Sequence, residues 1–156
     1  QLYDKAVRLL ARRAHGRKEL GRKLRRKGGA PEAVEEALDK LEERGYLDDT
    51  EFAYLRALRR RQVNLWGNIR ISLDLKRLGL SARIIELALE RVEKEFPETA
   101  SLQRLISSRI RVQGQPRTSE QLKKLFDHCI RLGHSPEQVR NELSEYFRSV
   151  EWNTHP

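Results

Sequence analysis

A repeated pattern constrains this chain more than any other feature of its sequence. Three nine-residue segments begin at Leu20, Ile71 and Leu125, and each has two apolar positions four residues apart followed by a glycine four residues later. The glycines are Gly28, Gly79 and Gly133. A pattern that recurs about every 50 residues is the signature of a repeat architecture rather than of a single globular core.

Each of these segments lies between two other amphipathic phrases. The preceding phrases start near Ala6, Phe52 and Leu102, and the following phrases start near Val34, Ile84 and Val139. Their apolar residues are spaced i, i+3, i+4 and i+7, and the chain is rich in Leu, Arg, Glu and Ala, so the period is helical. We predict three helices per repeat, nine in total, with the last one running without a break from Val139 through Tyr146.

Local signals agree with this interpretation. Gly28 and Gly79 suit the position after a helix C-terminus, and Ser81 and Ser135 suit N-caps. Either Asp48 or Asp49 caps the helix that contains Phe52. The predicted repeats are 1–48, 49–96 and 97–156. Because a unit of about 50 residues is only marginally stable alone, we expect an all-α fold of three tandem three-helix units that pack on their neighbours in an elongated, curved modular array.

The overall composition limits the class of protein. Hydrophobic residues make up 38% of the 156 residues and charged residues 35%. No apolar run approaches the roughly 18 residues of a membrane span, and the N-terminus lacks the pattern of a secretory signal. The single cysteine, Cys129, cannot form an internal disulfide. We therefore expect a cytoplasmic protein with no membrane association.

Charge is distributed unevenly along the first predicted repeat. Residues 12–27 contain nine basic residues and one acidic residue, whereas residues 28–51 contain nine acidic and two basic residues. If Leu20 and Leu24 point inward, the basic side chains between them must point largely outward, as in a surface that binds phosphates or an acidic protein. The alternative is a solvated helix face that the neighbouring acidic helix partly neutralises.

A second basic cluster in the second predicted repeat is a candidate continuation of the first, and it comprises Arg56, Arg59, Arg60 and Arg61, followed across a short break by Arg70, Lys76 and Arg77. Trp66 beside it is a stacking platform for a base, an anchor for a partner, or a cover for the joint between two helices. Arginine predominates in both clusters, which favours bidentate contacts with carboxylate or phosphate. The candidate partner-binding or nucleic-acid-binding residues are Arg17, Lys18, Arg22, Arg25, Arg26, Arg59, Arg60, Arg61 and Arg70.

Catalytic patterns are scarce. Residues 16–23 superficially match a phosphate-binding loop but have Arg22 and Lys23 where Lys and Ser or Thr belong, and they follow no predicted strand. His128, Cys129 and His134 lack a fourth ligand for a structural zinc site, and Cys129 occupies an apolar position of the repeat. We expect no catalytic residue, no metal, no cofactor and no enzymatic activity.

Four phrases of the sequence together resemble a known family. They are Glu19–Leu24, Gly45–Ala53, Gly67–Leu80 and Leu125–Val139, and the most specific is Gly-Tyr-Leu-Asp-Asp followed by Phe-Ala. In this order they resemble the bacterial RecX regulatory proteins over nearly the whole chain. The resemblance implies a modular helical protein that binds the RecA recombinase filament, limits its growth and damps its ATPase, strand-exchange and coprotease activities. It places the chain in DNA repair, homologous recombination and the SOS response.

The partners that follow are the RecA filament and, in some family members, single- or double-stranded DNA. The alternative function is a sequence-independent DNA-binding helical module. A helix-turn-helix reader of paired half-sites is disfavoured, because the three predicted repeats differ in net charge and do not suggest a palindrome reader. We expect a monomer.

Overall fold

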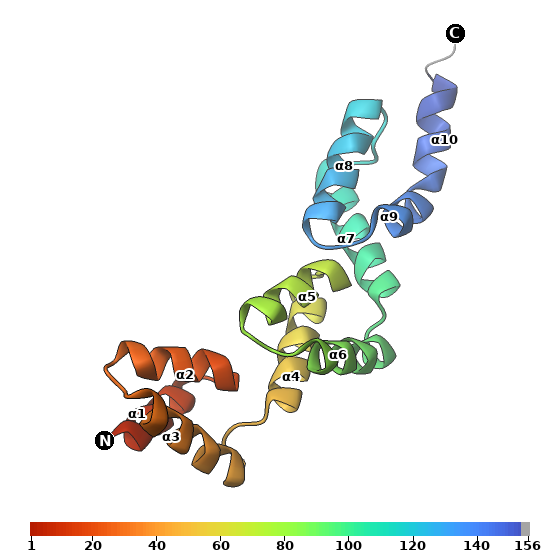
Figure 1. Cartoon of the computed structure of the whole chain (residues 1–156). Coiled ribbons are helices and arrows are strands. Elements are labelled where there is room, and N and C mark those ends of the chain that lie inside the picture. Colours follow the sequence, from red (N-terminus) through yellow and green to blue (C-terminus); the bar gives the residue numbers. More distant parts are fainter. Residues whose placement is uncertain (154–156) are drawn as a thin grey trace. The chain divides into compact units, whose positions relative to one another are not determined.

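The computed structural model describes residues 1–153, with side chains described through residue 150 (Figure 1). These residues form ten helices and no strand, so the all-α prediction is confirmed. The helices are α1 Leu2–Arg12, α2 Arg17–Arg26, α3 Pro31–Glu43, α4 Asp49–Gln62, α5 Asn68–Arg77, α6 Ala82–Glu95, α7 Glu98–Gln113, α8 Ser119–Arg131, α9 Pro136–Glu142 and α10 Ser144–Asn153. We refer to α1–α3, α4–α6 and α7–α10 as the first, second and third helix groups.

The repeated pattern corresponds to α2, α5 and α8, each of which ends in the same turn. Gly28, Gly79 and Gly133 have φ of 91°, 83° and 94°, in the left-handed region that favours glycine. The residue after each glycine donates its backbone N–H to the carbonyl five residues earlier, at N···O distances of 3.0, 3.3 and 3.3 Å. This is the Schellman arrangement that satisfies carbonyls at a helix end. The carbonyl that accepts belongs to the second apolar position of the repeat: Leu24, Leu75 or Cys129.

The first helix group encloses its own core. Ala6 of α1, Leu20 and Leu24 of α2, and Val34 and Leu41 of α3 each have essentially no exposed surface. Figure 1 shows these three helices packed against one another. The inward orientation predicted for Leu20 and Leu24 is therefore confirmed, and it fixes which face of α2 is left for solvent.

The third helix group has a separate core and departs from the prediction. Leu122, Leu125 and Cys129 of α8 are buried with residues of α7 and α9. The helix expected to run unbroken from Val139 through Tyr146 is instead interrupted at Leu143 and forms α9 and α10, so the prediction of nine helices is wrong by one. Backbone hydrogen bonds of 3.0 and 3.1 Å still pass through Leu143, which is fully buried. The helix therefore changes direction at Leu143, but its backbone hydrogen bonding continues across the interruption.

The chain divides into two compact units, Gln1–Arg56 with Asp74–Glu90, and Ala57–Leu73 with Arg91–Pro156. Helices of the second group thus contribute to both units. The boundaries between predicted repeats, after residues 48 and 96, stay a prediction.

In each unit, one helix group caps a helix of the preceding group. In the first unit, the Asp49 carboxylate at the start of α4 accepts a hydrogen bond of 2.8 Å from the backbone N–H of Arg17, the first residue of α2. In the second unit, the Glu98 carboxylate at the start of α7 accepts one of 3.0 Å from the N–H of Asn68, the first residue of α5. An acid at the first position of one group therefore satisfies a free N–H at a helix N-terminus of the group before it.

The two aspartates proposed as caps thus have different roles. Asp48 caps α4 itself, because its carboxylate accepts from the N–H of Glu51 at 3.1 Å. Asp49 caps α2. The predicted N-caps Ser81 and Ser135 are confirmed, with bonds of 3.3 and 3.2 Å to the N–H three residues later.

Candidate partner-binding surface

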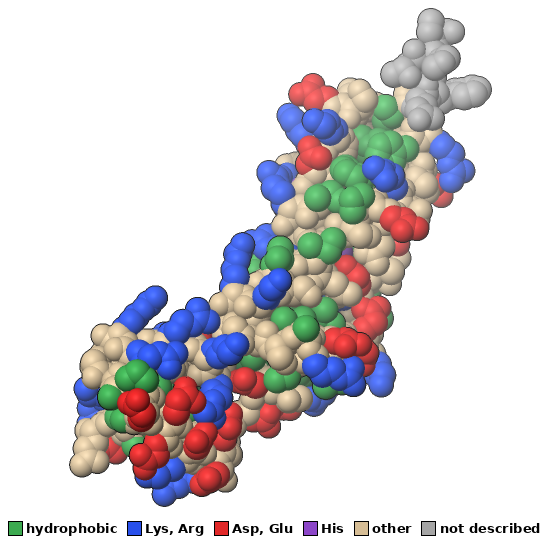
Figure 2. Space-filling view, in the orientation of Figure 1, with side chains coloured by type: hydrophobic (Ala, Val, Ile, Leu, Met, Phe, Trp, Pro, Cys, Tyr) green, Lys and Arg blue, Asp and Glu red, His purple; other side chains and the backbone are tan. Residues whose placement is uncertain are grey.

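The basic residues of α2 form an exposed surface in the first unit. Lys18, Arg22, Arg25 and Arg26 are exposed on the side of α2 opposite the buried Leu20 and Leu24. Figure 2 shows Lys and Arg side chains over α2 and Asp and Glu side chains over α3. The helix group therefore presents a basic face and an acidic face, as the charge pattern predicted. We call Lys18, Arg22, Arg25 and Arg26 the α2 surface.

The end of α5 lies against the α2 surface. Arg22 Nη2 donates to the backbone carbonyl of Arg77 at 3.3 Å. A Cβ added to Gly79 would stand 2.8 Å from the side chain of Lys18. The exposed Arg77 of the second basic cluster thus lies beside the α2 surface, as a continuation of the first basic cluster, although it was not among the nine candidate site residues. Gly79 marks the turn that packs against α2.

Arg17 belongs to the fold rather than to the α2 surface. Its guanidinium contacts the carboxylates of Glu35, Asp39 and Glu42, all on α3, at 2.8, 2.7 and 2.8 Å. Burial lowers the pKa of Arg17, but the hydrogen bonds to the three carboxylates outweigh burial and raise it above its ordinary value. The expectation that Arg17 points outward is wrong, because its guanidinium is directed toward the three carboxylates of α3. For Arg17, the alternative interpretation holds: the neighbouring acidic helix neutralises its charge.

A second polar cluster, formed around Glu19 and His15, stabilises the start of α2. Glu19 pairs with Arg13 and lies 3.6 Å from Lys23 Nζ. Lys23 also donates to His15 Nε2 at 2.8 Å, and His15 Nδ1 is 2.9 Å from the carbonyl of Arg13. A neutral imidazole protonated on Nδ1 satisfies both contacts. Burial, together with the nearby charges of Arg13 and Lys23, lowers the pKa of His15.

In the second unit, two candidate arginines enclose the candidate tryptophan. The guanidinium carbons of Arg60 and Arg70 lie 4.8 and 4.1 Å from the centre of the Trp66 ring. Arg70 also donates to the carbonyl of Arg131 at 3.2 Å. Trp66 is thus half-buried at the joint between α4 and α5 and is engaged by protein cations, which supports its interpretation as a cover for the joint. Arg59 is exposed on α4.

Arg61 is misplaced in the candidate set. Its side chain has no exposed surface, and its guanidinium contacts Glu93 at 3.4 Å, the carbonyl of Phe96 at 3.5 Å and the amide oxygen of Asn68. Burial lowers the pKa of Arg61, with Glu98 and Glu93 opposing that effect. Arg61 is the polar centre of a joint between α4, the start of α5 and the end of α6, so it does not belong to an exposed basic surface.

Cys129 occupies the core, as its place in the repeat predicted. It is fully buried, and burial raises the pKa of its thiol to about 11. Within residues 1–153, no three His, Cys, Asp or Glu side chains come together in a way that would hold a metal ion. In the same range, none of the helices combines the length and the apolar character that crossing a bilayer requires.

The fold and the surfaces together define a helical-repeat protein with opposed basic and acidic faces. A family model described as the first three-helix domain of RecX matches residues 3–50. The regulatory protein RecX of Xanthomonas axonopodis pv. citri (strain 306) is 37% identical over 137 residues, covering 88% of this chain and 82% of the relative. That of Halorhodospira halophila is 34% identical over 137 residues, covering 88% and 83%. The chain belongs to the RecX family of regulatory proteins.

Solved structures give the same fold. The crystal structure of RecX from Lactobacillus salivarius superimposes with a TM-score of 0.78 at 20% identity, covering 92% of this chain and 93% of that one. A second crystal structure, of a regulatory protein RecX, gives 0.76 at 21% identity, covering 92% and 70%.

Proposed function

We propose that this chain binds the filament of the RecA recombinase and inhibits its extension and its ATPase, strand-exchange and coprotease activities, thereby modulating DNA repair and recombination in the cytoplasm. Membership of the RecX family supports a regulatory role. By linkage, such a protein stabilises whichever state of the filament it binds best.

The α2 surface carries the proposal. Lys18, Arg22 and Arg26 lie on one helix that Leu20 and Leu24 anchor in the core, so their charges are presented by a rigid element. The acids of α3 that could neutralise them are drawn instead to Arg17, and Arg25 is only loosely paired with Glu35, at 3.7 Å. A concentrated cationic helix of this kind accelerates association with an acidic surface and fixes its orientation.

The test is the steady-state ATPase rate of RecA on single-stranded DNA with substoichiometric amounts of this chain. We expect inhibition by the unmodified chain and its loss when Arg22, Arg25 and Arg26 are all changed to Glu. Circular dichroism must show unchanged helicity in the variant. If the variant inhibits as well as the unmodified chain, the α2 surface is not the contact.

A matched control separates local contact from total charge. Arg83→Glu, Lys94→Glu and Arg111→Glu together make the same change in net charge at three exposed positions outside α2. This control variant should inhibit almost normally. A DNA-binding assay across a salt series completes the design. Steeply salt-dependent DNA binding without ATPase inhibition would replace the proposal with the DNA-binding module.

A further inference from the structure

The third helix group has a pocket at the place where the second group holds a tryptophan. In the second group, the Trp66 ring fills the space between the guanidinium groups of Arg60 and Arg70. Arg60 is the twelfth residue of α4, and Leu65, five residues later, has a positive φ of 58°. Arg70 lies nine residues before Gly79.

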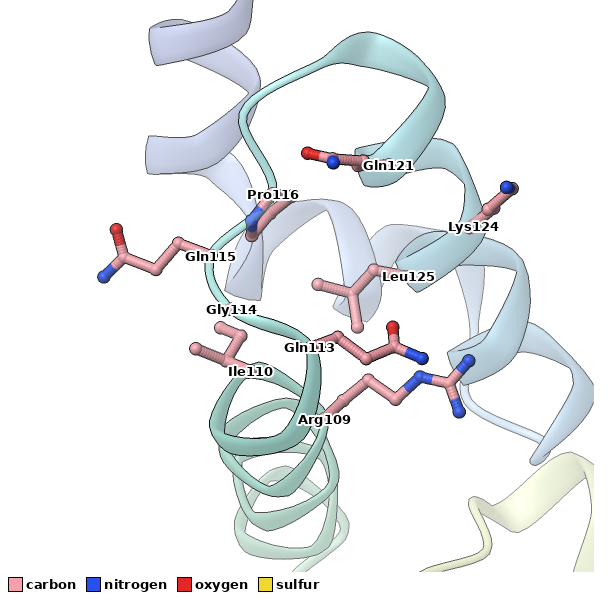
Figure 3. A pocket seen from close by; sticks show the side chains of 9 residues that line it. All are labelled: Arg109, Ile110, Gln113, Gly114, Gln115, Pro116, Gln121, Lys124 and Leu125. Atoms are coloured by element: carbon pink, nitrogen blue, oxygen red, sulfur yellow. The ribbon is translucent and has the colours of Figure 1, made fainter.

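The same positions of the third group keep the cations but lack the ring. Arg109 is the twelfth residue of α7, and Gly114, five residues later, has a positive φ of 81°. Lys124 lies nine residues before Gly133. The residue that corresponds to Trp66 is therefore Gln115, whose side chain points away from the pocket in Figure 3.

The pocket, of about 250 Å³, lies between the last turn of α7, the loop that follows it and α8. Its apolar lining comes from Ile110 and the buried Leu125, and Gln113 and Gln121 add amide groups (Figure 3). Arg109 and Lys124 also line it, and Lys124 Nζ lies 3.6 Å from the Glu120 carboxylate. The lining itself contains no acidic and no aromatic residue. Arg109 Nε is buried without a hydrogen-bond partner. The pocket is smaller than the roughly 300–1,000 Å³ of typical small-molecule sites, so it fits a single side chain.

We propose that this pocket binds one aromatic side chain of a protein partner, which occupies the place that Trp66 occupies in the second group. Apolar walls with amides and cations around them match a ring with a polar handle, as in Tyr or Trp. A carboxylate would match the charges of Arg109 and Lys124 but would leave Ile110 and Leu125 against a charged group. The pocket lies in the second unit and includes no residue of the α2 surface. This inference therefore does not depend on the proposed function.

The test uses a probe molecule on the whole chain. N-acetyl-L-tryptophanamide is titrated into ¹⁵N-labelled protein, and we expect saturable shifts of the side-chain amide signals of Gln113 and Gln121 at millimolar probe. N-acetyl-L-aspartate methylamide, the acidic control, should leave these signals in place. Shifts with the acidic compound alone, or none with the aromatic compound, would overturn the proposal.

The decisive variant is Gln115→Trp, which supplies the missing ring from within the chain. It should weaken probe binding about tenfold or more while the remaining amide spectrum stays native-like. Lys124→Gln, at an exposed position, is a second variant that keeps the test valid if Gln115→Trp does not fold, and it should weaken probe binding severalfold. Unchanged probe affinity in Lys124→Gln, or in a folded Gln115→Trp, would refute the site.

Discussion

Replacing Asp49 tests whether one helix group stabilises a helix of another. The residue that precedes α2 is Gly16, which has no side chain for capping, and the N–H of Arg17 depends on the Asp49 carboxylate 2.8 Å away. Loss of a capping side chain costs about 1 kcal/mol. The attraction between a carboxylate and the positive end of a helix adds about 0.3–1 kcal/mol. Asp49→Ala should therefore destabilise α2 by about 1.5 kcal/mol.

Asp49→Asn separates the two contributions. The amide oxygen keeps an acceptor for the N–H of Arg17 but carries no charge, so only the part of about 0.3–1 kcal/mol should be lost. Native-state hydrogen exchange at the Arg17 amide is the direct readout, with urea denaturation as the global one. We expect exchange about tenfold faster in Asp49→Ala and a smaller acceleration in Asp49→Asn.

Asp48→Ala is the matched control, because Asp48 is the neighbouring acid but caps α4 through the N–H of Glu51. Its effect should appear in the amides at the start of α4 and not at Arg17. If Arg17 exchanges equally fast in all three variants and in the unmodified chain, α2 does not rely on Asp49 and the capping argument fails.

Three further predictions concern buried groups. Burial lowers the folded-state pKa of His15 and His134 below the ordinary 6.5, so the unfolded chain takes up protons first as pH falls. The free energy of unfolding from urea titrations should therefore drop between pH 7.5 and 5.5. A rise over this range would contradict the lowered pKa of the two histidines. The Cys129 thiol should resist a thiol-specific reagent at pH 8 in the folded chain and react quickly in urea; equal rates would show that it is not buried. Arg61→Ala should cost about 3 kcal/mol because it leaves a cavity where a fully buried side chain stood, and Arg61→Leu should cost less because it fills part of that space, which denaturation of both variants would check.

Features that depend on local interactions were predictable from the sequence. A glycine four residues after a buried apolar position specifies the turn at the end of α2, α5 and α8, because the left-handed conformation and the bond to the carbonyl five residues earlier involve one helix end only. For the same reason, Cys129 could be assigned to the core from its place in the repeat. The positions of Ser81 and Ser135 at helix starts also follow from nearest neighbours.

Contacts between helices were not predictable, because nothing in the local sequence specifies the partner of a charged side chain. Arg17 and Arg22 are both basic residues on the same helix. Yet three carboxylates of α3 surround Arg17, while Arg22 remains exposed and touches α5. Charge density predicted that α2 has a basic face, but only the packing of α3 and α5 against α2 determines which cations remain available to a partner.

Arg61 shows how helical position can outweigh charge. Its neighbours Arg59 and Arg60 suggest a continuous basic cluster, but Arg61 lies four residues after Ala57 and eight after Ala53, both buried. These positions form one stripe on α4, so the side chain at 61 has to enter the joint whatever its chemistry. The corresponding residue of α7 is the apolar Ile110. Extending the apolar stripe along α4 would have removed Arg61 from the candidate surface, and it explains why Glu93, Asn68 and the Phe96 carbonyl surround this guanidinium.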